Sequence, residues 1–155
     1  MRNRAAVLIA TWFGCGFSPV APGTVGSLAA ILIAWLLVHY SGWQPLWFVP
    51  LALILLLPAV WAADVTARLR KQKDPGVVVV DEVVGQWVAI AGARRLNLTS
   101  WILAFVLFRL FDIWKPVPVR NLERIPGGAG IVADDLMAGF YAALVLLITG
   151  CFNLY

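Results

Sequence analysis

Two long apolar stretches, residues 27–40 and 47–63, constrain this chain more than any other feature of its sequence. A membrane-spanning helix needs about 20 predominantly apolar residues, and each stretch supplies most of one. Of the 155 residues, 62% are hydrophobic and 13% are charged, which is more apolar surface than a soluble core of this size could bury. We therefore expect an all-α, polytopic membrane protein.

Three further apolar runs follow, at residues 83–93, 101–111 and 137–152. The run 83–93 is too short to cross a hydrocarbon core of about 30 Å as a straight helix. The sequence thus predicts about four to five membrane helices, one of them short or re-entrant, in a single domain that covers residues 1–155. Residues 112–135 are predicted to form a loop, and the last helix is expected to be entered at Asp134 and Asp135.

The charged residues orient this arrangement. A basic cluster at residues 68–73 marks the cytoplasmic side, although Arg94 and Arg95 then fall on the outer side, against the positive-inside tendency. The apolar segment behind Arg4 is expected to remain as a short helix near the membrane surface. The formal charge of +4 is small and scattered, so no nucleic-acid partner is expected.

The acidic residues are predicted to converge at one face of the membrane. With helices running alternately in and out, they lie at helix ends on the cytoplasmic side: Asp64, Asp81, Glu82, Asp112, Asp134 and Asp135. Carboxylates that face one another raise each other's proton affinity unless a cation neutralises them. Ligands that are all oxygens favour magnesium, which commonly bridges protein carboxylates to a substrate phosphate.

Individual acids also have simpler interpretations. Asp81 and Asp134 are good N-cap residues, and Asp64 with Arg68 could form a surface pair at i, i+4. Asp112 is harder to explain in this way, because the carboxyl end of a helix disfavours an anion unless a cation lies nearby.

A phosphate site is predicted beside these acids. Residues 18–27 form a glycine-rich turn, whose free backbone N–H groups, with the Thr24 and Ser27 hydroxyls, could hold an anion. The same residues could instead be only a turn and a helix cap. The nearby cations could bind phosphate or merely lipid headgroups: Arg109, Lys115 and Arg120.

Four ordered motifs give the chain a resemblance to the phosphatidylglycerophosphatase A family. They are Gly14-x-Gly-x-Ser-Pro19 continuing through Pro22-Gly-Thr-Val-Gly-Ser27, Asp81-Glu-Val-Val-Gly85, Arg109-x-x-Asp112-x-x-Lys115-Pro-x-Pro-x-Arg120, and Gly127-Gly-x-Gly-x-x-x-Asp134-Asp135. The resemblance spans nearly the whole chain. Glu123 departs from the family pattern, in which an aspartate is expected before the glycines.

The resemblance implies a magnesium-dependent phosphatase of the bacterial inner membrane, with its active site facing the cytoplasm. Its substrate would be phosphatidylglycerophosphate, cleaved to phosphatidylglycerol and phosphate in phospholipid synthesis. The implied acidic site and the residues argued above combine into one assignment. The catalytic candidates are Asp112, Asp81, Asp135 and Lys115; the metal ligands are Asp81, Glu82, Asp112, Asp134 and Asp135; the phosphate-binding residues are Thr24, Gly26, Ser27, Arg109, Lys115 and Arg120.

Two rival functions use similar residues. A CDP-alcohol phosphotransferase also has acids and metal in the membrane, but its longer ordered series of Asp, Gly and Arg is not found here. A small ion transporter would use acids as a permeation site, which is expected at mid-membrane rather than at helix ends. The sequence therefore favours the phosphatase and leaves its oligomeric state open.

Overall fold

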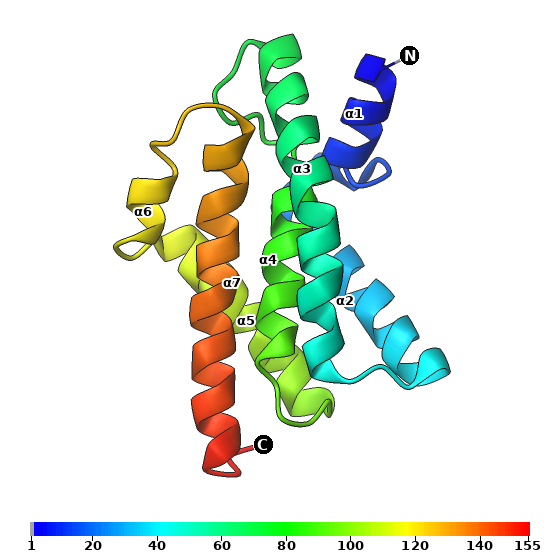
Figure 1. Ribbon diagram of the computed structural model, residues 1–155, viewed down its shortest axis with the longest axis vertical. Helices are drawn as coiled ribbons and strands as arrows, with labels where there is room; N and C mark the ends of the chain where they lie inside the picture. The colour runs from blue at the N-terminus through cyan, green and yellow to red at the C-terminus, as the bar shows by residue number, and fades with distance from the viewer. Residues whose placement is uncertain (1) are drawn as a thin grey trace.

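The computed structural model describes residues 2–155, and over this range the chain is helical without strands (Figure 1). The elements, in order, are α1 (Arg2–Ala10), η1 (Cys15–Phe17), α2 (Pro22–Ser41), η2 (Pro45–Trp47), α3 (Phe48–Arg70), α4 (Val80–Ala91), α5 (Leu98–Trp114), α6 (Val119–Leu122) and α7 (Gly128–Cys151). The all-α prediction is confirmed, and the segment behind Arg4 is the short helix α1.

Helix α4 is short and lies in the middle of the bundle, in contact with α2, α3, α5 and α7. Its 12 residues give a length of about 18 Å, too little to cross a membrane. Ten of them are buried, so the apolar sequence of α4 is satisfied by protein rather than by lipid. The Trp87 indole N–H donates to the Ala30 carbonyl at 3.1 Å and ties α4 to α2. The short predicted segment is thus an internal helix.

Glycine lets α7 pack directly against α4. A Cβ atom on Gly139 would collide with the Gly85 carbonyl oxygen, and one on Gly85 would lie 2.6 Å from the Asp135 carbonyl oxygen. Farther along, a Cβ on Gly92 would collide with the Ala143 backbone. Small residues of this kind allow helix backbones to approach closely inside a membrane protein. The contact fixes the position of Asp135, along the helix axes, relative to the first turn of α4.

Among residues 2–155, three helical segments are long and apolar enough to cross a membrane: Pro22–Ser41, Pro45–Arg70 and Gly128–Cys151. Helix α5, with 17 residues, is slightly shorter, but it also exposes a row of large apolar side chains, namely Ile102, Val106, Leu110 and Ile113. The helices are therefore those of a membrane protein, as expected from the composition.

The prediction of a loop over residues 112–135 is wrong. Helix α5 continues to Trp114, residues 119–122 form α6, and α7 begins at Gly128, so Asp134 and Asp135 lie inside a helix. The glycines that resemble a flexible loop have a packing role, because a Cβ on Gly128 would collide with the Val60 carbonyl oxygen. The Gly128 N–H also donates to Asp64 Oδ1 at 3.3 Å, which stabilises the start of α7.

Substitution of Gly139 tests the close contact between α4 and α7. The change Gly139→Ala should destabilise the protein by about 1–3 kcal/mol, the usual range for overpacking, because the Gly85 backbone cannot move aside independently. Thermal unfolding in detergent measures the effect. The matched control is Gly76→Ala, since a Cβ there meets nothing within 4 Å. Equal stability of the two variants would contradict the proposed packing.

Candidate functional site

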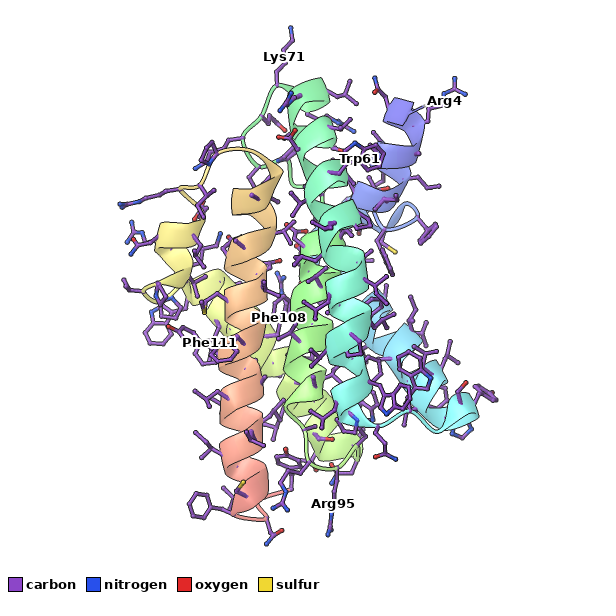
Figure 2. All side chains as sticks on the ribbon, viewed as in Figure 1. Arg4, Trp61, Lys71, Arg95, Phe108 and Phe111 are labelled. Atoms are coloured by element: carbon purple, nitrogen blue, oxygen red, sulfur yellow. The ribbon has the colours of Figure 1, made fainter. Side chains whose placement is uncertain are left out.

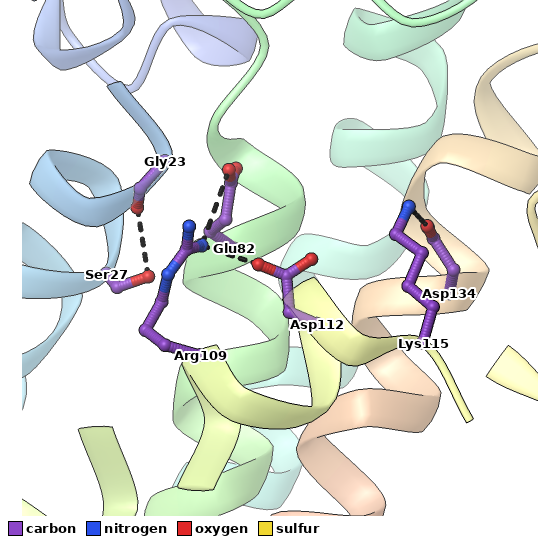
Figure 3. Close-up of polar contacts among 7 residues, drawn as sticks. All are labelled: Gly23, Ser27, Glu82, Arg109, Asp112, Lys115 and Asp134. Atoms are coloured by element: carbon purple, nitrogen blue, oxygen red, sulfur yellow. Dashed lines mark hydrogen bonds and ion pairs between the residues drawn. The ribbon is translucent and has the colours of Figure 1, made fainter. Parts of the chain in front are cut away.

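A polar cavity of about 230 Å³ lies where α2 and α4 begin and α5 ends, against the first turns of α7. Figure 3 shows side chains of α4, α5 and α7 directed toward this region, beside the start of α2. The cavity is lined by Ala21, Pro22, Gly23, Asp74, Gly76, Val78, Asp81, Glu82, Arg109, Asp112, Lys115, Ile131, Asp134 and Asp135. The predicted convergence of Asp81, Glu82, Asp112, Asp134 and Asp135 is thus present in the structure, whereas their roles stay predictions.

Three of these carboxylates form the centre of the cavity. Asp81 and Glu82 in the first turn of α4, and Asp135 in α7, have oxygen atoms that all lie within 4.8 Å of one another. Asp81 and Asp135 are buried. Asp81 Oδ1 and Glu82 Oε2 are both buried without a hydrogen-bond partner within residues 2–155. Buried polar atoms in this state ordinarily have a partner, so the cluster is suited to a cation.

Arg109 provides the cation that the position of Asp112 requires. Its Nη1 atom lies 2.6 Å from Asp112 Oδ2 and 3.9 Å from Glu82 Oε1 (Figure 3). Asp112 is in the last turn of α5, where the helix dipole disfavours an anion, and the guanidinium one turn earlier compensates for it. A cation of the chain itself therefore lies beside Asp112, as its place at the end of a helix requires.

Lys115 and Asp134 form a second ion pair at the cavity wall. Lys115 Nζ lies 2.8 Å from Asp134 Oδ2 and 3.3 Å from Glu123 Oε2. Burial by itself disfavours the charged ammonium, but the hydrogen bond and the charge of Asp134 outweigh burial and raise the pKa of Lys115. Glu123, the residue that departs from the family pattern, therefore supports Lys115 from the outside of the cavity.

Lys115 reaches this position through an unusual backbone. It ends α5 with φ 49°, in the left-handed conformation that non-glycine residues seldom adopt. Ala21, which precedes α2 at the opposite wall, has φ 45°. Such conformations are costly and cluster at functional sites.

The cavity carries more acids than bases. Six carboxyl groups line it, those of Asp74, Asp81, Glu82, Asp112, Asp134 and Asp135, and two cations, Arg109 and Lys115. Lys115 pairs with Asp134, and Arg109 pairs with Asp112 and, at 3.9 Å, with Glu82. Within residues 2–155 no ion pair is formed by Asp81 or Asp135, so the cluster of three carboxylates has only the distant share of one cation. Oxygen ligands in this number and spacing fit magnesium, which prefers carboxylates and retained waters.

The predicted phosphate loop meets the cavity through different residues from those expected. Ala21, Pro22 and Gly23 line the cavity, but Thr24, Gly26 and Ser27 do not. Gly26 packs against Val79, and the buried Ser27 hydroxyl donates to the Gly23 carbonyl at 3.0 Å. Arg120, an exposed residue of α6, also lies outside the cavity lining.

Gly23 is the point of closest approach between α2 and the acids. A Cβ atom on Gly23 would collide with Glu82 Oε1 and lie 3.2 Å from Arg109 Nη1. The glycine therefore leaves space at the positive end of the α2 dipole, next to the carboxylates. The predicted anion-binding feature is thus the helix start itself.

One acid of the cavity lining was not predicted, and neither was a buried polar residue outside the lining. Asp74 lines the cavity, and burial is the main cause that raises its pKa. Its sequence neighbours Lys71 and Lys73 make the segment resemble an ordinary basic turn. The only other sequence signal beside Asp74 is the turn predicted at Pro75-Gly76. Gln86, one turn below Glu82, is fully buried, and neither of its amide atoms has a hydrogen-bond partner within residues 2–155.

The simpler capping interpretations of two acids are wrong. The N-cap of α4 is Val79 and that of α7 is Gly127, so neither Asp81 nor Asp134 caps a helix. Asp64, by contrast, pairs with Arg68 at 2.8 Å, as the i, i+4 spacing predicts, and lies outside the cavity lining.

The chain is similar to known proteins over most of its length. Residues 8–149 match the sequence model of the family described as Phosphatidylglycerophosphatase A. A "Phosphatidylglycerophosphatase A" of Escherichia coli K12 is 40% identical over 145 residues, covering 92% of this chain and 82% of the relative. One of Haemophilus influenzae Rd is 39% identical over 141 residues, covering 90% of this chain and 85% of the relative.

Another relative carries a different name. A "Putative phosphatidylinositol-3-phosphatase" of Bacteroides thetaiotaomicron is 40% identical over 147 residues, covering 92% of this chain and 91% of the relative. No solved structure matches the chain.

Removal of the Lys115 charge tests the second ion pair. The change Lys115→Met should destabilise the protein by about 3 kcal/mol, because Asp134 remains buried without its cation. The control is Lys71→Met: Lys71 also ends a helix in the left-handed conformation, but no ion pair is recorded for it within residues 2–155. Thermal unfolding compares the two, and an equal effect would exclude the ion pair as the cause.

Proposed function

The chain belongs to the phosphatidylglycerophosphatase A family, and we propose that its acidic cavity is the catalytic site of that activity. The enzyme hydrolyses the terminal phosphate monoester of phosphatidylglycerophosphate and releases phosphatidylglycerol and phosphate. The observation that carries the assignment of the site is the meeting of three clustered carboxylates, an arginine and the start of α2 in one cavity.

Magnesium is the proposed cofactor, held by Asp81, Glu82 and Asp135. The support is the donor set, which is all oxygen, and the two buried carboxylate oxygens that lack a partner. A magnesium ion bound there would neutralise part of the negative charge on the phosphate oxygens. It would act on the bound substrate and on the negative charge that develops during phosphoryl transfer. Asp112 and Asp134 are proposed to orient Arg109 and Lys115 through their ion pairs rather than to bind the metal. Asp74 is a further acid of the cavity wall.

Other residues of the cavity are proposed to bind the phosphate and to balance its charge. Arg109, oriented by Asp112, is placed to bind the phosphate together with the backbone N–H groups at the start of α2. Lys115 is placed to balance charge at the opposite wall. Hydrolysis forms a bond from a water oxygen to phosphorus and breaks the bond from phosphorus to the glycerol oxygen, either in one displacement by water or through an aspartyl phosphate that water then cleaves. The water proton passes to a carboxylate of the cavity, and the glycerol oxygen takes up a proton.

The position of the cavity suits a lipid substrate. Helix α2 starts at the cavity and runs for 20 residues, about 30 Å, which matches the thickness of a hydrocarbon core. We place the cavity at one membrane boundary, with α2, α3, α5 and α7 as the spanning helices and α4 as the short internal one.

The end of the molecule beyond the cavity carries Arg4 and Lys71, and the opposite end carries Arg95 (Figure 2). We propose that the cavity faces the cytoplasm at a bacterial inner membrane, and the support for this orientation is the basic cluster at residues 68–73.

The rival functions have less support. The acids gather at helix ends beside a cavity rather than along a path through the bundle, which is unlike an ion permeation route. Family membership separates the chain from the CDP-alcohol phosphotransferases. The preference of the site for one lipid headgroup is a separate question, because a relative of equal identity carries the name "Putative phosphatidylinositol-3-phosphatase".

Phosphate release by the purified protein tests the proposed site. With phosphatidylglycerophosphate, magnesium should support release and a chelator should abolish it. Asp112→Asn should lower kcat about a hundredfold or more, because Arg109 loses the anion that orients it. The control Asp64→Asn, an acid outside the cavity whose amide oxygen can still accept from Gly128, should stay within about twofold.

Phosphatidylinositol 3-phosphate is assayed in parallel. A higher kcat/KM on that lipid would reassign the headgroup and leave the site intact. Full activity of folded Asp112→Asn, or activity in chelator, would contradict the assignment of the residue or of the metal.

A further inference from the structure

Gln86 is a buried polar residue that has no part in the catalytic proposal above. It lies in the middle of α4, and its side chain is fully buried. Neither its amide nitrogen nor its amide oxygen has a hydrogen-bond partner among residues 2–155. Buried amide groups are ordinarily paired, because an unpaired one loses its hydrogen bonds to water without compensation. The position would suit an apolar side chain, as at the equally buried Ile90 one turn farther on, so a glutamine there calls for partners.

The first partner within reach is Glu82, one turn closer to the acidic cavity. Residues four apart in an α-helix lie on the same face, with about 5–6 Å between their Cβ atoms. Side chains also lean toward the start of their helix, which directs Gln86 toward the turn that carries Glu82. Glu82 Oε2 is itself buried without a hydrogen-bond partner in the described part of the chain. An unpaired donor and an unpaired acceptor thus lie one helical turn apart.

The second partner is Arg109 of α5, which meets Glu82 from a neighbouring helix (Figure 3). Arg109 Nη1 lies 3.9 Å from Glu82 Oε1. The Arg109 Nε–H group is buried, and no acceptor for it is found within residues 2–155. A carboxamide offers a donor and an acceptor at once. Gln86 therefore carries the donor that Glu82 lacks and the acceptor that Arg109 lacks.

The packing of α4 against α5 brings Gln86 and Arg109 to the same level. Helix α4 runs away from the acidic cavity and α5 runs toward it, and both residues lie about one turn from the cavity end of their helix. Their sequence neighbours, Gly85 and Phe108, are in contact: a Cβ atom on Gly85 would collide with the Phe108 ring. The two helices thus touch where these polar side chains lie.

We propose that Gln86 is a positioning residue that joins Glu82, the proposed metal ligand, to Arg109, the proposed phosphate-binding residue. Its amide N–H donates to Glu82 Oε2, and its amide oxygen accepts from the Arg109 Nε–H. Rotations about the flexible side-chain bonds of Gln86 and Glu82 form this bridge when Glu82 turns to a bound cation. The inference rests on the proposed function and its magnesium site. The bridge sets the spacing of the cation and the guanidinium, the two positive charges that the phosphate would meet.

Binding of Mn²⁺ to the whole protein in detergent, followed by electron paramagnetic resonance, tests this role. Gln86→Met keeps an unbranched side chain of similar length and removes both hydrogen-bonding groups. It should weaken Mn²⁺ binding about 10- to 100-fold, the usual effect of losing a group that orients a metal ligand. Ile90→Met is the matched control, because Ile90 is equally buried on the same face of α4 and lies outside the cavity lining. The control should bind Mn²⁺ as the wild type does.

Thermal unfolding in chelator separates positioning from a structural role. Gln86→Met should unfold at the wild-type temperature or above it, because an apolar side chain replaces a buried amide without partners. Weaker Mn²⁺ binding together with a lower unfolding temperature would assign Gln86 to the stability of the fold and overturn the proposal. Unchanged binding by Gln86→Met, or equal weakening in Ile90→Met, would contradict it as well.

Nuclear magnetic resonance tests the bridge in the wild-type protein. The chain has three glutamines, and the other two, Gln44 and Gln72, are exposed. With ¹⁵N in the glutamine side chains, the buried Gln86 amide is identified by its slow exchange with deuterated water. Its proton signal should move downfield when Mg²⁺ is added, as the N–H begins to donate to a carboxylate, and the signals of Gln44 and Gln72 should stay in place. A Gln86 signal that does not move would refute the bridge.

The same experiments distinguish failure of the bridge from failure of the proposed function. If the wild type binds Mn²⁺ and releases phosphate from phosphatidylglycerophosphate, while Gln86→Met matches its Mn²⁺ affinity, the function stands and the bridge alone is refuted. If the wild type binds no Mn²⁺, the proposed magnesium site fails and the bridge fails with it.

Discussion

The close contact between α4 and α7 is the constraint on which the acidic site depends. Because Gly85 and Gly139 lack side chains, the two backbones meet, and Asp135 is held at the level of Asp81. A bulkier residue at either glycine would separate the helices and with them the carboxylates. The enclosure of α4 by its neighbours has the same consequence, since it fixes the first turn of α4 beside the start of α2 and the end of α5.

The charge of the site follows from this packing. Carboxylates gathered in one partly buried cavity repel one another, and two ion pairs remove part of that repulsion, Arg109 with Asp112 and Lys115 with Asp134. In the remaining cluster, Glu82 has only the longer contact of 3.9 Å with Arg109, and Asp81 and Asp135 have no such partner among the described residues. This imbalance favours a cationic cofactor in the folded protein, and it also provides the charge distribution that a phosphate monoester needs when it is bound through that cofactor.

Much of the fold and of the site could be predicted from the sequence, because both depend on composition and on ordered motifs. Apolar runs located the membrane helices, and the convergence of Asp81, Asp112 and Asp135 followed from alternating their direction. The start of α7 was missed, because glycines at 128 and 130 resemble a loop in sequence while they serve close packing in space.

Tertiary contacts account for the other differences. Asp74 could not be recognised, since its lysine neighbours conceal a side chain that only the fold turns toward the cavity. Within the predicted turn at residues 18–27, the sequence does not distinguish Gly23, which faces Glu82, from Gly26, which packs on Val79 outside the cavity lining.

The binding of a divalent ion to the protein without substrate tests the central claim most directly. Titration of metal-free protein with Mn²⁺, followed by electron paramagnetic resonance, should reveal a site that magnesium competes for. Changes in residues around metal ligands typically weaken binding about 10- to 100-fold, so Asp135→Asn, which removes a direct ligand, should weaken it about a hundredfold or more. Asp64→Asn should bind as the wild type does. Absence of binding in the wild type, or undiminished binding by folded Asp135→Asn, would contradict a metal held by Asp81, Glu82 and Asp135.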